Sequence, residues 1–410
     1  MPAYWQGGPP VAVGLTDRLG APLAADAFDN LRVTQKHQLF DNYHKYEIDL
    51  NEWGVVATGG GTVSHLPNES SAKIEVSSAD GARAMIRQHT YNRYQAGRGI
   101  GTKFTIIHGD TPTTLSLVRR TFTSGTAVDN EIARTSWTHD RVDRDISSSF
   151  ALDVTRGNIY GIDIAWLGVA GARFFVNNHL VHLDDHLNRL TTPYMTSATL
   201  PLTYEVVNSG AFQYRRWGYF DDRDGYFYQS VSPRAAGHIK SICSSVWSDG
   251  GSNGHGSSFA ALGSATIAAG AVTALPLMAI RPKLLYNAIT NRSIILPTRI
   301  VASSELKAAS IAVVYNPTLT GGAWVSADAT SGVEYNSTAT AIAGGSVLHY
   351  EYIQPDSSAS VDVTALFSQL GRKLRLDHTG TVQDIVAVRG ISEVGGAANM
   401  RASMSWLESR

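Results

Sequence analysis

Apolar and polar residues alternate along much of this chain with a period of two. Between positions 160 and 167, the apolar side chains of Tyr160, Ile162, Ile164 and Trp166 would all lie on one face of an extended strand. Long amphipathic helical patterns are missing, and the best helical segment, 363–370, is only about two turns long. Similar strand segments, flanked by Gly, Asn, Asp or Pro, lie at 73–76, 103–107, 172–176, 203–207 and 225–229. The pattern predicts an all-β fold with few short helices.

The character of the sequence divides the chain into four parts. Residues 1–27 are rich in Pro, Gly and Ala and are expected to form an extended N-terminal arm. Residues 28–250 are predicted to form a β-sandwich of the jelly-roll or lectin-like kind. A Gly/Ser/Ala-rich stretch at 251–269 is typical of a linker, and 270–410 are predicted to form a second β-sandwich domain. The expected strands of this second domain lie at 294–302, 311–324, 347–353, 373–377 and 384–392.

Composition narrows the classes of function. The net charge is −1, which gives no overall attraction to nucleic acid or to an anionic membrane surface. The longest uncharged stretch, 257–280, is interrupted by Gly and Pro, so we expect no membrane insertion. The N-terminal sequence lacks the pattern of a secretory signal. The single cysteine, Cys243, excludes an intramolecular disulfide, fits synthesis in a reducing cytoplasm, and is expected to be packed in an apolar strand.

Three motifs resemble sites of known chemistry, and each has a plainer interpretation. His179, His182 and His186 lie near Asp184 and Asp185, but their spacing does not match zinc-binding patterns, so a hairpin strand is favoured. The segment 220–228 crowds three Asp around a Gly, yet its register departs from that of a calcium loop. A hairpin turn is therefore predicted there, with a weak surface calcium site left open. The segment 97–101 is glycine-rich, but a strand pattern follows it, so phosphate binding is not expected.

No catalytic residue, metal ligand or cofactor can be nominated, and a glycosidase carboxylate pair stays open because Asp and Glu are scattered. Mixtures of aromatic residues and arginine, in contrast, are typical of protein interfaces. We weigh this interpretation equally with simple strand packing. The candidate interface residues are Tyr94, Arg98, Arg215, Arg216, Trp217, Tyr219 and Arg223.

Short motifs spread over nearly the whole chain resemble those of tailed-bacteriophage virion structural proteins of the tail-fibre or minor structural type. An F-x-x-L-R-V motif is matched at Phe28 to Val33, and a Y-Q-P-G-[KR] turn at Tyr94 to Arg98, with Ala96 in place of Pro. The other matches are a loose H-E-x-x-H-x-N run at His182, His186 and Asn188, a P-Y-x-x-x-A-x-L-P segment at 193–201, C-S-S-V at 243–246, and S-W-x-E at 405–408.

The resemblance implies a non-enzymatic component of the virion, made in the host cytoplasm. Its expected partners are other phage structural proteins in the tail, baseplate or fibre, and we expect a homo-oligomer, either a trimer or a ring. Two alternatives keep the β-sandwich fold. The first is a receptor-binding protein for a host-surface glycan, for which the loops around Trp217 and Trp324 supply suitable residue types. The second is a capsid decoration or head-fibre protein.

Overall fold

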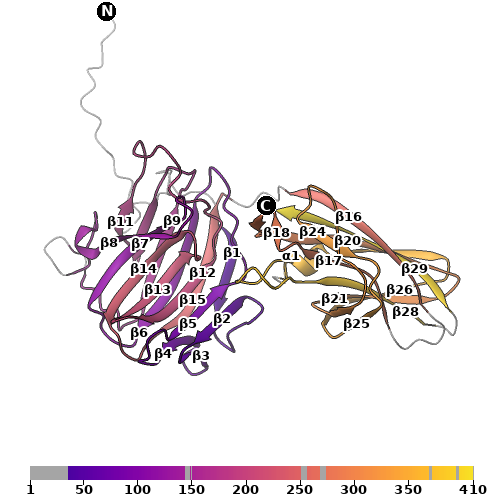
Figure 1. Ribbon diagram of the computed structural model, residues 1–410, viewed down its shortest axis with the longest axis horizontal. Helices are drawn as coiled ribbons and strands as arrows, with labels where there is room; N and C mark the ends of the chain where they lie inside the picture. The colour runs from indigo at the N-terminus through magenta and orange to yellow at the C-terminus, as the bar shows by residue number, and fades with distance from the viewer. Residues whose placement is uncertain are drawn as a thin grey trace, which may run out of the picture.

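The computed structural model describes residues 36–143, 148, 150–250, 256–267, 274–368, 372–393 and 397–409. These residues form antiparallel sheets, together with one 3-10 turn and one short α-helix, α1 (Thr364–Ser368). Two groups of sheets follow one another along the chain, from residues 36 to 249 and from 257 to 409 (Figure 1). The predicted all-β fold of two sandwiches with few short helices is confirmed. The predicted N-terminal arm, 1–27, and the Phe28–Val33 motif lie outside the described residues.

The first sandwich consists of two large sheets. The eight-stranded sheet has the order β11 (His179–Asp184), β10 (Ala172–Val176), β9 (Asn158–Ile164), β6 (Ile100–His108), β15 (Gly237–Asp249), β4 (Ser71–Val76) and β3 (Gly61–Leu66), and β1 (Lys36–Tyr43) also pairs with β15. The seven-stranded sheet has the order β2 (Trp53–Thr58), β5 (Arg83–Gln88), β12 (Leu202–Ser209), β13 (Phe212–Phe220), β14 (Gly225–Pro233), β7 (Thr114–Thr121) and β8 (Val128–Ala133). The 3-10 turn, η1 (Arg134–Ser136), follows β8.

Aromatic side chains fill the space between these two sheets. Trp217 of β13 stacks on Tyr228 of β14 with ring centroids 5.9 Å apart, and both contact Tyr160 of β9 in the opposite sheet at 5.3 and 4.9 Å. All three side chains are fully buried. Because side chains alternate across a strand, this packing fixes which face of each strand points to solvent.

The second sandwich is built in the same way from smaller sheets. One has the order β16 (Ser257–Ile267), β29 (Ala398–Ser409), β20 (Ile294–Glu305) and β27 (Ser357–Asp362). The other has the order β23 (Val325–Ser326), β24 (Val333–Asn336), β17 (Leu275–Pro282), β28 (Val386–Ser392), β21 (Ala309–Tyr315) and β26 (Ser346–Ile353). Two short ladders pair β18 (Leu285–Tyr286) with β19 (Ile289–Thr290), and β22 (Thr318–Thr320) with β25 (Ala341–Ala343). Trp406, Met404 and Phe367 are fully buried in its core.

The predicted linker, 251–269, extends too far, because β16 occupies residues 257–267. Its residues alternate between exposed and partly buried, as in a strand. The sheets approach closely at Gly263, where an added Cβ would lie 2.1 Å from the carbonyl oxygen of Leu277. The small residues that suggested a flexible linker therefore permit tight packing instead.

Two further predictions are wrong. Segment 373–377 forms only isolated bridges, from Leu374 to Ile295 and from Leu376 to Gln383. Leu374 and Leu376 are buried, while Arg375 between them contacts the first sandwich. Cys243 is exposed rather than packed, because an irregularity in β15 between residues 241 and 244 shifts the alternation of its side chains.

Arg375 connects the two sandwiches. Its guanidinium group donates hydrogen bonds to the Asn51 carbonyl oxygen at 2.6 Å and to the Thr90 hydroxyl, and it pairs with the Glu52 carboxylate at 3.2 Å. Only 6% of Arg375 is exposed. Nearby, the backbone N–H of His378 donates to Nδ1 of His89 at 2.9 Å. These contacts join the sandwiches through a buried, charged junction.

We expect Arg375→Ala to weaken this junction. Removing one partner of a buried ion pair leaves the other without compensation, which costs about 3 kcal/mol. Denaturant unfolding followed by tryptophan fluorescence should show the loss. Arg401→Ala is the control, because Arg401 is 66% exposed beside Glu305 and its loss should change stability by less than about 0.5 kcal/mol. Equal stability of the two variants would contradict the role assigned to Arg375.

His108 should make the first sandwich sensitive to acid. Burial, aided by the charges of Arg215 and His238, lowers the pKa of His108 to about 3. Below its ordinary pKa of 6.5, the unfolded chain takes up a proton that folded His108 does not accept until about pH 3. As the pH is lowered from 6.5 to about 3, this group should therefore reduce the free energy of unfolding by about 1.4 kcal/mol for each pH unit.

Unfolding measured at pH 7 and pH 5 tests this expectation. His108→Leu should reduce the loss of stability between the two pH values by about 2 kcal/mol. His37→Leu changes an exposed histidine and should leave that loss unaltered. An unchanged pH dependence in His108→Leu would show that other groups determine the acid response.

Candidate functional site

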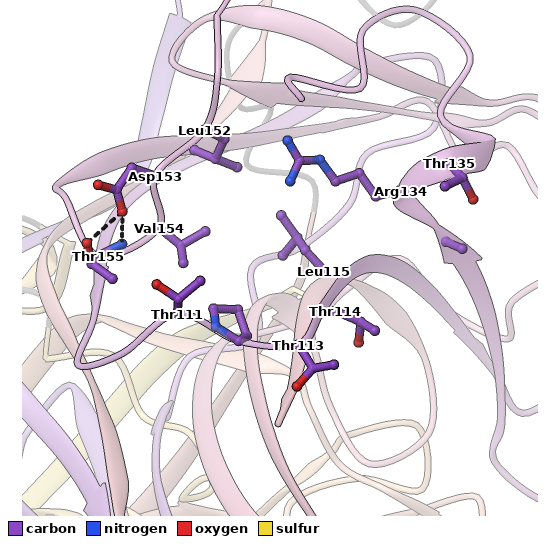
Figure 2. A pocket seen from close by; sticks show the side chains of 12 residues that line it. Thr111, Thr113, Thr114, Leu115, Arg134, Thr135, Leu152, Asp153, Val154 and Thr155 are labelled. Carbon is purple, nitrogen blue, oxygen red and sulfur yellow. Dashed lines mark hydrogen bonds between the residues drawn. The ribbon is translucent and has the colours of Figure 1, made fainter. Parts of the chain in front are cut away.

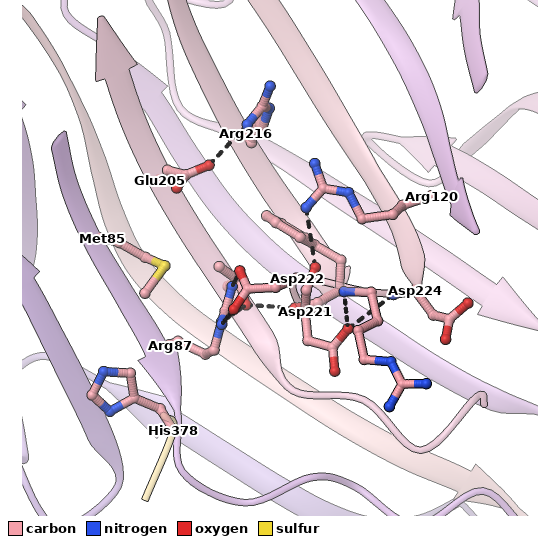
Figure 3. A network of polar contacts seen from close by, with 12 residues as sticks. Met85, Arg87, Arg120, Glu205, Arg216, Asp221, Asp222, Asp224 and His378 are labelled. Atoms are coloured by element: carbon pink, nitrogen blue, oxygen red, sulfur yellow. Dashed lines mark hydrogen bonds and ion pairs between the residues drawn. The ribbon is translucent and has the colours of Figure 1, made fainter. Parts of the chain in front are cut away.

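The outer face of the seven-stranded sheet carries paired charges. Alternation places Arg83 and Arg87 of β5, Glu205 of β12, Arg216 of β13 and Arg120 of β7 on this face, opposite the aromatic core. Figure 3 shows Arg87, Arg120, Glu205 and Arg216 with the turn 221–224, which joins β13 to β14. We call this surface the arginine–aspartate face.

Glu205 lies between two arginines in the middle of this face. Its carboxylate accepts from Nε of Arg83 at 2.7 Å and from Nη1 of Arg216 at 3.1 Å. Burial opposes ionisation of Glu205, but the charges of Arg216 and Arg83 outweigh it and hold the pKa of the carboxyl below its usual value. Glu205 is therefore an ionised group held in place from two sides.

Asp222 is the most accessible carboxylate of the network. Arg87 donates two parallel hydrogen bonds to it, each 2.9 Å long, and the Arg87 side chain is only 4% exposed whereas that of Asp222 is 72% exposed. The hydrogen bonds from Arg87 lower the pKa of Asp222 to about 2, against the effect of burial. The turn thus presents a carboxylate that is ionised near neutral pH and is held in one orientation by Arg87.

An aromatic layer lies beneath the arginines. Phe220 and Phe227 pack with centroids 4.3 Å apart and, with Val118, form a small buried cluster separate from the main core. The guanidinium group of Arg120 lies 5.2 Å from the centre of the Phe227 ring and pairs with Asp129. The contact with the Phe227 ring and the ion pair with Asp129 together restrict the Arg120 side chain.

The turn 221–224 uses its aspartates to hold itself in place. The Asp221 carboxylate accepts from the backbone N–H groups of Arg223 and Asp224 at 2.8 and 2.9 Å. The Asp224 carboxylate accepts from the backbone N–H groups of Thr196 and Phe122 at 3.0 and 3.2 Å. With Asp222 held by Arg87, each of the three carboxylates has a protein partner, and the predicted hairpin turn is confirmed.

The histidine-rich segment is also a hairpin strand, as predicted. β11 pairs with β10, and Nδ1 of His182 accepts from the backbone N–H of Thr138 at 3.2 Å. His186 and Asp184 both contact Nη1 of Arg119, at 2.9 Å in each case. Across the part of the chain that the structure describes, no group of three or more His, Cys, Asp or Glu side chains is arranged to hold a metal ion.

A second feature is a pocket of about 580 Å³ at one end of the first sandwich (Figure 2). Threonines and apolar side chains from the start of β7, from η1 and from the loop 152–155 line it. Its charged groups serve local structure: the Asp153 carboxylate accepts from the backbone N–H and the hydroxyl of Thr155, and Arg134 donates to the backbone carbonyls of Arg141 and Val142. The pocket therefore offers a hollow without an arranged reactive centre.

The seven predicted interface residues lie in three places. Arg215, Trp217 and Tyr219 are fully buried on the inner face of β13 and have no surface to offer a partner, so this part of the prediction is wrong. The face of β13 that carries these three side chains packs into the aromatic core between the two sheets. Arg216 and Arg223 lie on the arginine–aspartate face, where Arg216 is half-buried and Arg223 is exposed.

Tyr94 and Arg98 lie away from that face, in the loop before β6. The hydroxyl oxygen of Tyr94 accepts from the backbone N–H of Leu167 at 3.2 Å, and its ring packs edge-on against Trp166. Arg98 is half-buried. Neither Arg87 nor Glu205 is among the residues predicted from the sequence, and Asp222 enters there only as part of a possible calcium loop. A usable signal was Glu205, the only charged residue in the strand segment 203–207.

Comparisons with known proteins leave the family open. No family model matches the chain, and no curated protein matches it. Among solved structures, it is similar to a laminarinase from Flavobacterium sp. UMI-01, with 9% identity over 51% of this chain and 99% of that chain and a TM-score of 0.29. It is also similar to the exoplasmic/lumenal domain of VIP36 in its Ca²⁺/Man3GlcNAc-bound form, with 8% identity over 52% of this chain and 90% of that chain and a TM-score of 0.27.

A third similar structure is the CBM22-1–CBM22-2 tandem domain of Xyn10C from Paenibacillus barcinonensis, with 6% identity over 91% of this chain and 98% of that chain and a TM-score of 0.23. At such TM-scores, these likenesses carry no argument about function. No helix among the described residues is long and apolar enough to cross a membrane.

Gly225→Ala should disrupt the hairpin that presents Asp222. Gly225 has a φ of +145°, and an added Cβ would lie 2.3 Å from the Cβ of Phe220. We expect a loss of about 3 kcal/mol in the free energy of unfolding, because both backbone strain and overlap oppose the alanine.

Gly210→Ala provides the matched control for this variant. Gly210 also has a positive φ, +59°, but a Cβ there would meet open space, so the expected loss is only about 1 kcal/mol. Denaturant unfolding of both variants separates the two contributions. Equal losses would show that the contact with Phe220 does not constrain the turn.

Proposed function

We propose that this chain is a non-enzymatic carbohydrate-binding protein and that its arginine–aspartate face binds the glycan. The observation that carries the proposal is Asp222, an exposed carboxylate fixed by two hydrogen bonds from buried Arg87. Each sugar hydroxyl both donates and accepts a hydrogen bond, so a surface with fixed acceptors and donors side by side suits it. Because the groups are already held in place, little conformational freedom is lost on binding.

Arg223 and Phe122 extend this surface beyond the turn. The guanidinium group of Arg223 lies over the Phe122 ring, 4.3 Å from its centre, and Arg223 is exposed. Its N–H groups supply donors next to the Asp222 acceptor. The combination of a fixed acid, a stacked arginine and an aromatic ring offers polar contacts for hydroxyl groups and an apolar contact for the carbon face of a sugar.

The charge state of the face favours binding over hydrolysis. A glycosidase needs one carboxyl group that retains a proton near neutral pH and a second that is ionised. The pKa values of Glu205 and Asp222 are both lowered, mainly by Arg216 and Arg83 in the first case and by Arg87 in the second. Neither group is suited to donate a proton to a leaving oxygen.

A virion structural role is the second candidate function, and it combines readily with glycan binding in a receptor-binding component. The sequence resemblance supports it, and so does the surface of β26, at the edge of its sheet. Tyr350 and Tyr352 on this strand are 52% and 72% exposed, and tyrosine is enriched at protein interfaces. Mass spectrometry of purified phage particles tests this role: the chain should be present in fixed stoichiometry, and its absence from particles would exclude it.

The glycan proposal is tested with the full chain on a glycan array, followed by calorimetric titration of the oligosaccharide that binds best. Arg223→Ala should weaken binding about tenfold, because it removes a charged donor from the surface. Asp222→Asn should weaken it to a similar degree. Thermal unfolding of each variant distinguishes lost contacts from lost structure.

Arg234→Ala is the matched control. Arg234 belongs to the same sandwich and pairs with Asp80 at 3.5 Å, outside the arginine–aspartate face. It should bind glycan like the unaltered chain. Absence of any array signal, or unchanged affinity in both face variants, would overturn the proposal.

A further inference from the structure

A cleft lies where the two sandwiches meet. It has two adjoining compartments, of about 370 and 470 Å³, which share lining residues that include Thr90, Ser368 and Lys373. β1 and the end of β5 supply one wall, and the segment around Lys373 and the strands β20 and β29 supply the other. Small-molecule sites occur preferentially at such domain boundaries.

Two buried amides border this cleft, and each has one unsatisfied polar atom. Gln88 is 0% exposed, and its Oε1 accepts from Nδ2 of Asn92 at 2.8 Å and from the backbone N–H of Leu202 at 3.4 Å. Its Nε2 has no hydrogen-bond partner. Because the N–H of Leu202 can only donate, the orientation of the Gln88 amide is fixed with Nε2 as the free group.

Asn92 presents the complementary case. It is 2% exposed, and its Nδ2 donates to Gln88 and to the carbonyl oxygen of Leu200 at 3.3 Å, which fixes Oδ1 as the remaining atom. Oδ1 has no partner. Gln88 lines the first compartment and Asn92 the second, and their two amides are bonded to each other. Nε2 and Oδ1 have almost no exposed surface, so a ligand in the cleft must displace neighbouring side chains to reach them. Buried polar groups are normally satisfied, and an unsatisfied pair at a cleft therefore points to a ligand.

The charges of the cleft indicate the class of that ligand. Its charged side chains comprise three carboxylates and three cations, namely Asp41, Asp49, Glu52, Arg93, Lys373 and Arg375. These formal charges cancel, so the cleft favours neither an anion nor a cation overall. Apolar side chains, including Leu39, Ile294, Leu296 and Leu407, line the second compartment.

We propose that the cleft between the sandwiches is a binding site for a neutral sugar, distinct from the arginine–aspartate face. A hydroxyl group can accept from Nε2 of Gln88 or donate to Oδ1 of Asn92, so a polyol can satisfy both amides in more than one orientation. The apolar wall suits the carbon face of a pyranose ring. The cleft and the arginine–aspartate face would both bind a sugar, as the proposed function requires of the latter, but the two sites have no residue in common.

The test uses the full chain and ligand-observed NMR with glucose, galactose, mannose, N-acetylglucosamine and N-acetylgalactosamine. At least one should bind the unaltered chain. Ser368→Trp places a bulky ring at an exposed position that lines both compartments, and binding should fall at least tenfold. Ala365→Trp is the matched control, because Ala365 is an exposed position of the same helix that does not line the cleft, and it should retain binding.

Comparing Arg223→Ala with Ser368→Trp separates the two sites. Arg223→Ala should lose only the sugar bound at the arginine–aspartate face, whereas Ser368→Trp should lose the sugar bound in the cleft. If Arg223→Ala loses binding and Ser368→Trp retains it, the cleft proposal is wrong and the proposal for the outer face stands. Failure of all five sugars to bind the unaltered chain would also overturn the cleft site, whereas the glycan array tests the outer face independently.

Discussion

The packing of aromatic rings between the two large sheets is the constraint on which the first sandwich depends. Contacts run from Phe40 and Trp53 at one side, through Tyr204 and Phe104, to Tyr228 and beyond. Rings of this size fill the roughly 10 Å between stacked sheets, and they bury large apolar areas. A shift of one residue in any contributing strand would turn its rings to solvent, so the layer also fixes the register of the sheets.

The charged surface and the cleft both follow from this layer. Since the inner face of β13 is committed to Trp217 and Tyr219, its outer face is free to carry Arg216 opposite Glu205. At the margin of the layer, the hydroxyl of Tyr219 donates to the backbone carbonyl oxygen of Asn92 at 2.9 Å and so anchors the backbone of this cleft residue to the core. The surfaces proposed to bind sugar are thus held in place by rings that no ligand touches.

The sequence was sufficient for the fold class, because alternation is a local property and the strands at 172–176 and 203–207 recur in β10 and β12. Composition alone led to a wrong prediction for the linker. Glycine and alanine in β16 resembled a linker, although they permit close packing against β17. The sequence also could not tell the inner from the outer face of β13, because arginine and aromatic residues occupy both. The partnership of Arg87 with Asp222 joins positions 135 residues apart, a separation that no local pattern encodes.

In each sandwich, the first described strand pairs with the last: β1 with β15, and β16 with β29. During synthesis, neither domain can therefore complete its sheets until its final strand has left the ribosome, and such closure between distant segments is slow. The order of the domains along the chain moderates this difficulty. The first sandwich can close once residue 249 has emerged, while the second is still being made, so each domain exposes its unpaired strands separately and for a shorter time.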